Sequence, residues 1–281
     1  MNAFRASGRR SGVSLIELLV AMTLLGIIGL SILRTFTSQA RMVDLQAKRL
    51  DARAVSRAPI NLFMSEARMV ETGGSGVVAA TGSSVTLRIP VVMGLVCGTS
   101  GTATILSLMP VDSATLASAA ISGHAYRQGS GAYSYTEGTT TVSSYTGPAC
   151  TNESITTVSG GTMVAVTPQM AAAEVGSVAF LYQRVRYDFA ASTAIAGRVG
   201  LWRTLEQSGA TEELAAPFDA SSRFRYYRTD QDTVDTGIPT LSEIRGIRLE
   251  LVGASERTRF GKVTPETSAL QTAVFFMNRL N

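Results

Sequence analysis

The sequence predicts an α+β protein in which one long N-terminal helix packs on a mainly antiparallel β-sheet. Three patterns carry this prediction. Residues 13–33 form an apolar run of 21 residues in which Glu17 is the only charged side chain. A helical period of apolar residues continues beyond this run. The C-terminal third alternates apolar and polar side chains between turn residues, which is typical of half-buried strands.

The apolar run is long enough to cross a membrane. About 20 apolar residues at about 1.5 Å each span the hydrocarbon core of a bilayer. The leader before it carries Arg5, Arg9 and Arg10 and no acidic residue. By the positive-inside bias, the leader stays in the cytoplasm, and the chain after residue 33 is exported.

The leader and the start of the run resemble a known family. A short basic segment ending in Gly12, followed by VSLIELLVA, is similar to the amino terminus of type IV prepilins and type II secretion pseudopilins. The resemblance covers roughly residues 8–33. It implies that a prepilin peptidase cleaves between Gly12 and Val13 and that the new amino group of Val13 is N-methylated. It also implies that Glu17 sets the register of each subunit in a helical filament. The first mature residue of this family is most often Phe, whereas here it is Val.

The chemistry of Glu17 supports that implied role. A lone carboxylate in an apolar bundle costs several kcal/mol unless it is protonated or paired. Cleavage after Gly12 would create a positive amine on Val13, which can neutralise Glu17 of a neighbouring subunit. One alternative is an ordinary signal anchor with a stray Glu17. Another is a secretory signal cleaved after Ala40, although the run exceeds the roughly 7–15 residues of such signals.

Composition narrows the classes of protein. The net charge is +4, and removal of the three leader arginines leaves 4 − 3 = +1, so the basic pI is no evidence for a nucleic-acid partner. Two cysteines, Cys97 and Cys150, lie in the exported part. We expect a disulfide between them, worth about 2–4 kcal/mol. Two separate buried thiols are the alternative.

After residue 33 the helical pattern becomes amphipathic. Apolar side chains recur at spacings of four and three residues, and we expect this stripe to cover the apolar face of the sheet: Phe36, Ala40, Val43, Ala47, Leu50 and Ala54. A free coiled coil is the alternative. Pro59 is predicted to end or kink this helix and to start a second, short one that stops at Gly73-Gly74. The expected divisions are a leader (1–12), a membrane helix (13–33), helical segments (34–72) and a β-rich head (73–281).

The head is predicted to be a meander of strands. Residues 77–80 and 85–92 favour a hairpin, with Pro90 at a strand end or an edge, and residues 102–109 favour another strand. Exposed hairpins or long loops are expected in the Gly-, Ser- and Thr-rich stretch at 128–161. Five later segments alternate clearly and are expected to pair: 178–189, 199–204, 224–228, 244–252 and 268–277.

Candidate chemistry in the head is sparse. His124 is the only histidine, and it is expected in a loop before a strand, exposed or packed rather than catalytic. Asp230, Asp232 and Asp235 only partly match a calcium loop, and a solvated acidic turn is favoured, so no metal is assigned. Arginines on the late strands could bind single-stranded DNA, but nearby acidic residues favour a solvated face. We expect that the protein is not an enzyme and that it binds no cofactor.

The layout implies a function through the family resemblance. A long helix, a proline-started helix and a late β-meander are similar to PilW-like minor pilins and to J-type pseudopilins. The first implies filament initiation or tip assembly in a type IV pilus, and the second implies a type II secretion system. A tip-located module that binds DNA or surfaces is the third possibility. The implied partners are other pilin subunits, a prepilin peptidase and the inner-membrane assembly platform, with the chain single-pass in the inner membrane.

Overall fold

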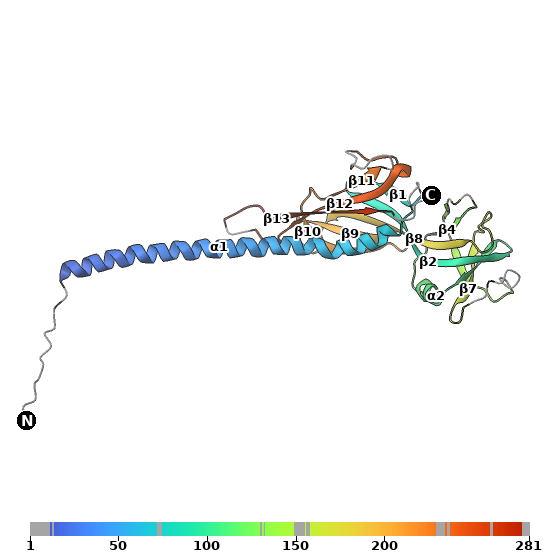
Figure 1. Ribbon diagram of the computed structural model, residues 1–281, viewed down its shortest axis with the longest axis horizontal. Coiled ribbons are helices and arrows are strands. Elements are labelled where there is room, and N and C mark those ends of the chain that lie inside the picture. Colours follow the sequence, from blue (N-terminus) through green and yellow to red (C-terminus); the bar gives the residue numbers. More distant parts are fainter. Residues whose placement is uncertain are drawn as a thin grey trace, which may run out of the picture.

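The computed structural model describes residues 12, 14–71, 75–129, 131, 133–148, 155, 158–228, 234, 237–258 and 261–276. A long helix extends from a β-rich head, which confirms the predicted α+β, pilin-like fold (Figure 1). The helices are α1 (Leu15–Arg68), α2 (Pro110–Leu116) and the short 3₁₀ helix η1 (Leu241–Glu243). The strands are β1 (Val77–Ala80), β2 (Ser84–Ser100), β3 (Ala103–Leu108), β4 (Gly123–Arg127), β5 (Tyr133–Glu137), β6 (Thr141–Ser144), β7 (Thr162–Thr167), β8 (Val178–Ala191), β9 (Val199–Leu205), β10 (Ala210–Phe218), β11 (Arg223–Arg228), β12 (Ile244–Ala254) and β13 (Thr267–Phe275).

Helix α1 runs through Pro59 without a break, so the expected second helix after Pro59 is wrong. Proline removes one backbone hydrogen bond, but here its ring lies on the buried face of the helix. The same face buries Ala52, Ser56, Phe63 and Ala67. These spacings of three and four residues form one continuous stripe against the sheet, and that packing compensates for the lost hydrogen bond.

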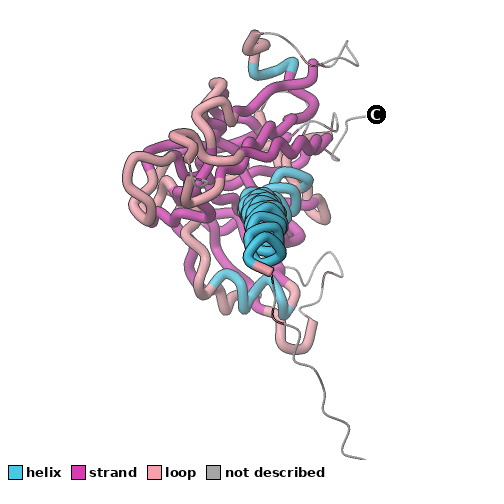
Figure 2. Tube along the Cα trace, turned by 90° about the vertical axis from the view of Figure 1, so that its left-hand side faces the viewer, coloured by secondary structure: helices cyan, strands magenta, loops and turns pink. Residues whose placement is uncertain are grey.

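The apolar stripe predicted to cover the sheet faces solvent instead. Phe36, Val43 and Leu50 are 67%, 65% and 64% exposed. At about 100° per residue, this stripe lies about half a turn away from the stripe through Ala52 and Phe63 that packs on the sheet. Figure 2, seen along the helix, shows the strands on one side of α1. The expectation that the apolar stripe from Phe36 to Ala54 packs on the sheet is therefore wrong, and this face of α1 stays uncovered.

All the described strands belong to one antiparallel sheet. Its main path is β11-β12-β10-β9-β8-β2-β3-β7-β6, with β1 on β2, β13 on β12, and the β4–β5 hairpin on β8. The predicted 77–92 hairpin is present as β1 and β2, and the five late alternating segments are β8, β9, β11, β12 and β13. Strands β4, β7 and β10 were not predicted.

The long strands β2 and β8 divide the head into two lobes (Figure 1). The proximal lobe holds β1, β9 to β13, the first half of β2 and the second half of β8, and α1 packs on its β10, β12 and β13. The distal lobe holds β3 to β7, α2 and the other halves of β2 and β8, and it lies beyond the end of α1. Each lobe has its own buried apolar cluster, around Phe63 and Leu249 in the first and around Leu106 and Leu181 in the second.

Pro90 marks the passage between the lobes. It pairs with Tyr182 of β8, and a bulge follows it between Pro90 and Val92. On the other side of β2, pairing with β1 ends at Leu87 and pairing with β3 begins at Gly94. Pro90 therefore sits in a local edge of the strand, where its missing N–H costs no ladder hydrogen bond, as the sequence predicted.

Candidate assembly site

The predicted cleavage site lies at the start of the described chain. Gly12 is exposed, with open space around it. Val13 lies outside the described residues, so cleavage at Gly12–Val13 and methylation of Val13 stay predictions. Ser14 has an extended backbone and caps the N-terminus of α1. Gly12 and Ser14 are both exposed and outside the helix, which suits a peptidase that must reach the backbone here.

Glu17 occupies the first turn of α1 and already has a partner in the single chain. Its Oε2 accepts the backbone N–H of Ser14 at 3.2 Å. A carboxylate at this position also interacts favourably with the positive end of the helix dipole. The sequence carried a signal for this role, because Ser14 and Glu17 have the spacing of a capping box, yet only the assembly role was predicted. The carboxylate is exposed and accessible to a second subunit.

The first half of α1 meets the requirements of a membrane span. Among the described residues, α1 is the one helix with an 18-residue window apolar enough to cross a bilayer, at a mean hydropathy of 2.4, and none of that window is buried within the chain. The hydroxyls of Thr23 and Ser31 donate to carbonyls of their own helix, at 2.8 and 2.9 Å. Their polar groups are therefore satisfied without water, as lipid requires.

The second half of α1 is fixed to the proximal lobe by close packing. Gly253 of β12 allows this approach, because a Cβ there would overlap the Ala52 carbonyl oxygen and lie 2.9 Å from Ser56 Oγ. Farther along the helix, Glu66 forms an ion pair with Arg203 of β9 at 2.6 Å and accepts the hydroxyl of Tyr187. Burial first, and then the Glu66 carboxylate, raise the pKa of Tyr187 well above its ordinary value. These contacts join the second half of α1 and the proximal lobe into one packed unit.

The cysteine and calcium predictions fall partly or wholly outside the described residues. Cys97, near the end of β2, is disulfide-bonded. Cys150 lies outside the described residues, so the pairing of Cys97 with Cys150 stays a prediction. Asp230, Asp232 and Asp235 also lie outside them, and the calcium question is untested. Among the residues that are described, no group of three or more His, Cys, Asp or Glu side chains could hold a metal ion.

His124 is buried in β4, not in the loop where it was expected. Its Nδ1 lies 3.2 Å from the Thr140 hydroxyl, and its Nε2 has no hydrogen-bond partner in the described structure. Burial lowers the pKa of His124 to about 4, so the ring is neutral at pH 7. A fully buried neutral ring has no access to a substrate.

The arginines of the late strands are paired with carboxylates. Arg184 binds Glu206 at 2.9 Å, and Arg186 binds Asp188 at 3.1 Å. Glu250 alone takes three arginines from β11 and β12, at 2.8 to 3.3 Å: Arg223, Arg225 and Arg248. Burial alone would raise the pKa of Glu250, but hydrogen bonds and ion pairs with Arg223 and Arg225 outweigh it and lower that pKa. A face neutralised in this way gives little attraction for a phosphate backbone.

An apolar N-terminal helix with a carboxylate in its first turn, joined to a β-rich head, is consistent with a protein anchored in a membrane by its N-terminus. In a comparison with known families, residues 7–33 match the prokaryotic N-terminal methylation motif. This match covers the amino terminus alone, and it supports a type IV prepilin- or pseudopilin-type protein. The motif implies processing by a prepilin peptidase and assembly with other pilin subunits. No curated protein and no solved structure matches the chain.

Proposed function

We propose that the chain is a minor pilin, similar to the PilW type, that acts in the initiation or at the tip of a type IV pilus. Its role is structural and non-catalytic. The precursor sits once through the inner membrane, with the leader in the cytoplasm and the head outside. Prepilin peptidase removes residues 1–12, the amine of Val13 is methylated, and the assembly platform moves the mature chain into a filament.

The uncovered surface of α1 is the observation that carries this proposal. The chain leaves the apolar residues of the span exposed, and it leaves Phe36, Val43 and Leu50 exposed beyond the span. Lipid can cover the first group and Phe36 at its margin, but not Val43 and Leu50, which lie about 15 and 25 Å past residue 33. An apolar stripe of this kind requires a protein partner. Helices of neighbouring subunits, packed parallel to α1, would cover both groups at once.

Glu17 supplies the register in this proposal. In the single chain its carboxylate binds the Ser14 N–H. In the filament it would also face the amine of a neighbouring Val13, and a charged pair in an apolar bundle is stable only when both partners meet. The distal lobe adds bulk beyond the end of α1 (Figure 1), which suits a terminal position with fewer neighbours.

Substitution of Glu17 tests this proposal. Glu17→Gln keeps an oxygen for the Ser14 N–H but loses the charge, whereas Glu17→Ala loses both. We expect both variants to be cleaved and both to be depleted at least about tenfold from the sheared filament fraction, because a loss of roughly 1.4 kcal/mol already gives that factor. Ser31→Ala is the matched control, since this hydroxyl bonds only its own helix. Normal incorporation of Glu17→Gln would refute the charge-pair role.

The choice between a pilus and a secretion system rests on a separate experiment. Deletion of the gene should abolish surface pili if the chain is a minor pilin. Loss of secreted enzymes with intact pili would instead identify it as a J-type minor pseudopilin. In either case the Arg–Glu pairs of the late strands weigh against a DNA-binding role.

A further inference from the structure

The distal lobe carries an apolar pocket on the outer face of its sheet. Met93 and Leu95 of β2 point outward, while the alternate residues Val92 and Val96 point into the distal core. With Met109, Val158 and Val178 they line a pocket of about 310 Å³. Met93 and Met109 are each 52% exposed, so the pocket opens to solvent. Methionines on an open apolar surface are typical of sites that adapt to a peptide partner.

Asp112 is the one ionisable side chain among the described residues that line this pocket. It lies in the first turn of α2, and its Oδ1 accepts the backbone N–H of Met93 at 2.7 Å. That hydrogen bond fixes the carboxylate at the margin of the apolar surface. A partner that fills the pocket therefore meets one negative charge, and electrostatic complementarity favours a cation there.

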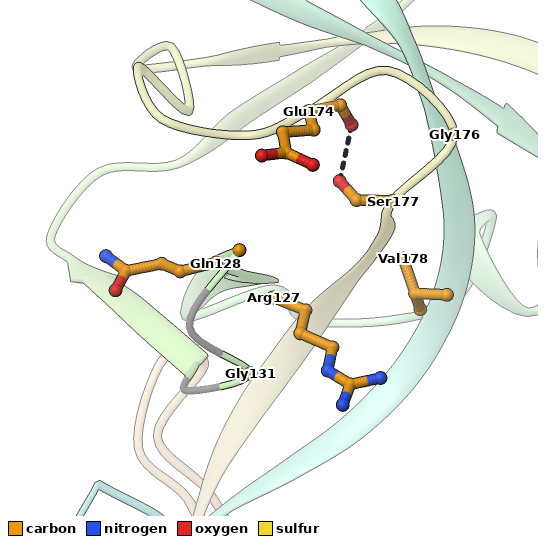
Figure 3. Close-up of a pocket in the computed structure, with 8 residues that line it drawn as sticks. Arg127, Gln128, Gly131, Glu174, Gly176, Ser177 and Val178 are labelled. Carbon is orange, nitrogen blue, oxygen red and sulfur yellow. Dashed lines mark hydrogen bonds between the residues drawn. The ribbon is translucent and has the colours of Figure 1, made fainter.

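A polar pocket of about 340 Å³ adjoins the apolar one through Val178, which lines both. Figure 3 shows Arg127 on one side of it and Glu174 and Ser177 on the loop opposite. The Ser177 hydroxyl donates to the Glu174 carbonyl at 2.6 Å, which stabilises that loop. The two pockets together form one surface. One end is apolar and has Asp112 at its margin, and the other end carries Arg127 and Glu174.

The chemistry of this surface selects its occupant. Lipid is excluded by position, because the distal lobe begins past Arg68, about 50 Å along α1 from the end of the span at residue 33. Nucleic acid is disfavoured by Asp112 and by the balance of Arg127 with Glu174. The described lining residues include no aromatic ring for a sugar to stack on. A polypeptide with apolar side chains and one cation fits every feature.

We propose that this outer face of the distal lobe binds an extended polypeptide segment of a partner protein, which inserts apolar side chains between Met93, Leu95 and Met109 and sets a lysine or arginine beside Asp112. The segment continues across Val178 toward Arg127. The site does not depend on Glu17 or on filament packing, so it can be tested whether or not the chain is a minor pilin.

The test uses the full-length chain in lipid nanodiscs and an array of random hexapeptides as the probe. The bound peptides should be enriched in those that combine aliphatic residues with lysine or arginine. One selected peptide is then titrated against the variants. Leu95→Glu should weaken its binding at least about tenfold, as loss of an anchor contact does. Asp112→Asn keeps an acceptor for the Met93 N–H, and it should remove the preference for lysine or arginine.

Val263→Glu is the matched control, since Val263 is 97% exposed and lies on the proximal lobe. It should bind the selected peptide as the unmodified chain does. Circular dichroism checks that all three variants keep the fold. The proposal is wrong if the array shows no enrichment, if the selected peptides are acidic, or if Leu95→Glu binds as tightly as Val263→Glu.

Discussion

At the scale of single residues, Glu17 has one role in the single chain and a second role in the proposed filament, and the two need different measurements. Its carboxylate accepts the Ser14 N–H within the chain and is exposed to a neighbour. Ser14 is the N-cap and Glu17 is the N3 residue of the capping box, so loss of the Glu17 carboxylate costs about 0.3–1 kcal/mol of helix stability. Loss of an assembly contact costs nothing in the isolated chain. The single-chain geometry is therefore compatible with both roles, and only incorporation into a filament measures the second.

Buried His124 makes stability depend on pH. Its pKa falls from 6.5 in the unfolded chain to about 4 in the fold, so between these values the unfolded state binds more protons. Acidification from pH 6.5 to pH 4 should therefore lower the free energy of unfolding, by up to about 3 kcal/mol from this residue. Chemical denaturation of the purified chain in detergent at several pH values measures the slope.

The control for this prediction is His124→Asn, which retains a polar atom near the Thr140 hydroxyl. The variant can be less stable at every pH, but its slope between pH 6.5 and pH 4.5 should be shallower. His124 is the only histidine in the chain, so no other imidazole confuses the comparison. An identical slope in both proteins would show that His124 is accessible to protons in the fold.

Gly253 lies where the backbone of β12 closely approaches the backbone of α1 at Ala52. A methyl group there would overlap the Ala52 carbonyl, and backbone cannot move aside as a flexible side chain can. Gly253→Ala should lower the free energy of unfolding by about 1–3 kcal/mol. Gly82→Ala is the control, because no atom lies within 4 Å of its Cβ position. Equal melting temperatures for the two variants would mean that α1 packs less closely than described.

At the scale of elements, the two faces of α1 have different tasks. Phe63 is fully buried on the sheet-packing face, and Leu50 is 64% exposed on the other. Phe63→Ala should cost about 3–5 kcal/mol of stability. Leu50→Glu should change stability by no more than about 0.5 kcal/mol while it reduces incorporation into filaments. Thermal unfolding and immunoblots of the sheared fraction provide the two readouts.

The reverse pattern would overturn this division of α1. If Leu50→Glu unfolds the chain and assembles normally whenever it folds, the exposed stripe packs within the chain. If both variants lose stability equally, the two faces cannot be separated. The expected result is that Phe63→Ala lowers stability, whereas Leu50→Glu lowers incorporation into filaments.

Local patterns predicted the elements better than they predicted their packing. The length of the apolar run and the alternation in β12 can be seen in the order of the residues, and the structure has a helix and a strand at these places. The face of α1 that packs on the sheet was not predictable from apolarity alone. The sheet uses small residues such as Ala52 and Ser56, because Gly253 brings the backbones close together. The more apolar stripe is left for other contacts.

The candidate assembly site rests on its motif and stays a prediction, and the rest of the molecule offered no comparable signal. Gly12, Val13 and Glu17 fall within a contiguous pattern that a sequence displays directly. The ion pair of Glu66 with Arg203 joins residues 137 positions apart, so neither residue indicates the other. Strand β10 was missed because its ATEELAAPF sequence combines adjacent carboxylates with a proline.

At the scale of the whole molecule, the two lobes follow from one long-range pairing. β2 and β8 pair from Ser84–Asp188 to Leu95–Val178, and each strand contributes to both lobes. Such pairing between distant segments has no local sequence signature, which explains why a single head was predicted without its division. The second half of α1 and the proximal lobe form one packed unit, and the distal lobe presents its own surface beyond them.

The central claim is that this chain is a processed subunit whose anchoring helix is later covered by its neighbours. Intact-mass spectrometry of the chain purified from membranes and from the sheared filament fraction, with and without reductant, tests it most directly. The account predicts a polypeptide that begins at N-methylated Val13 in both fractions and gains two mass units on reduction of one disulfide. A chain that still begins at Met1, or one that begins at Arg41, would contradict it.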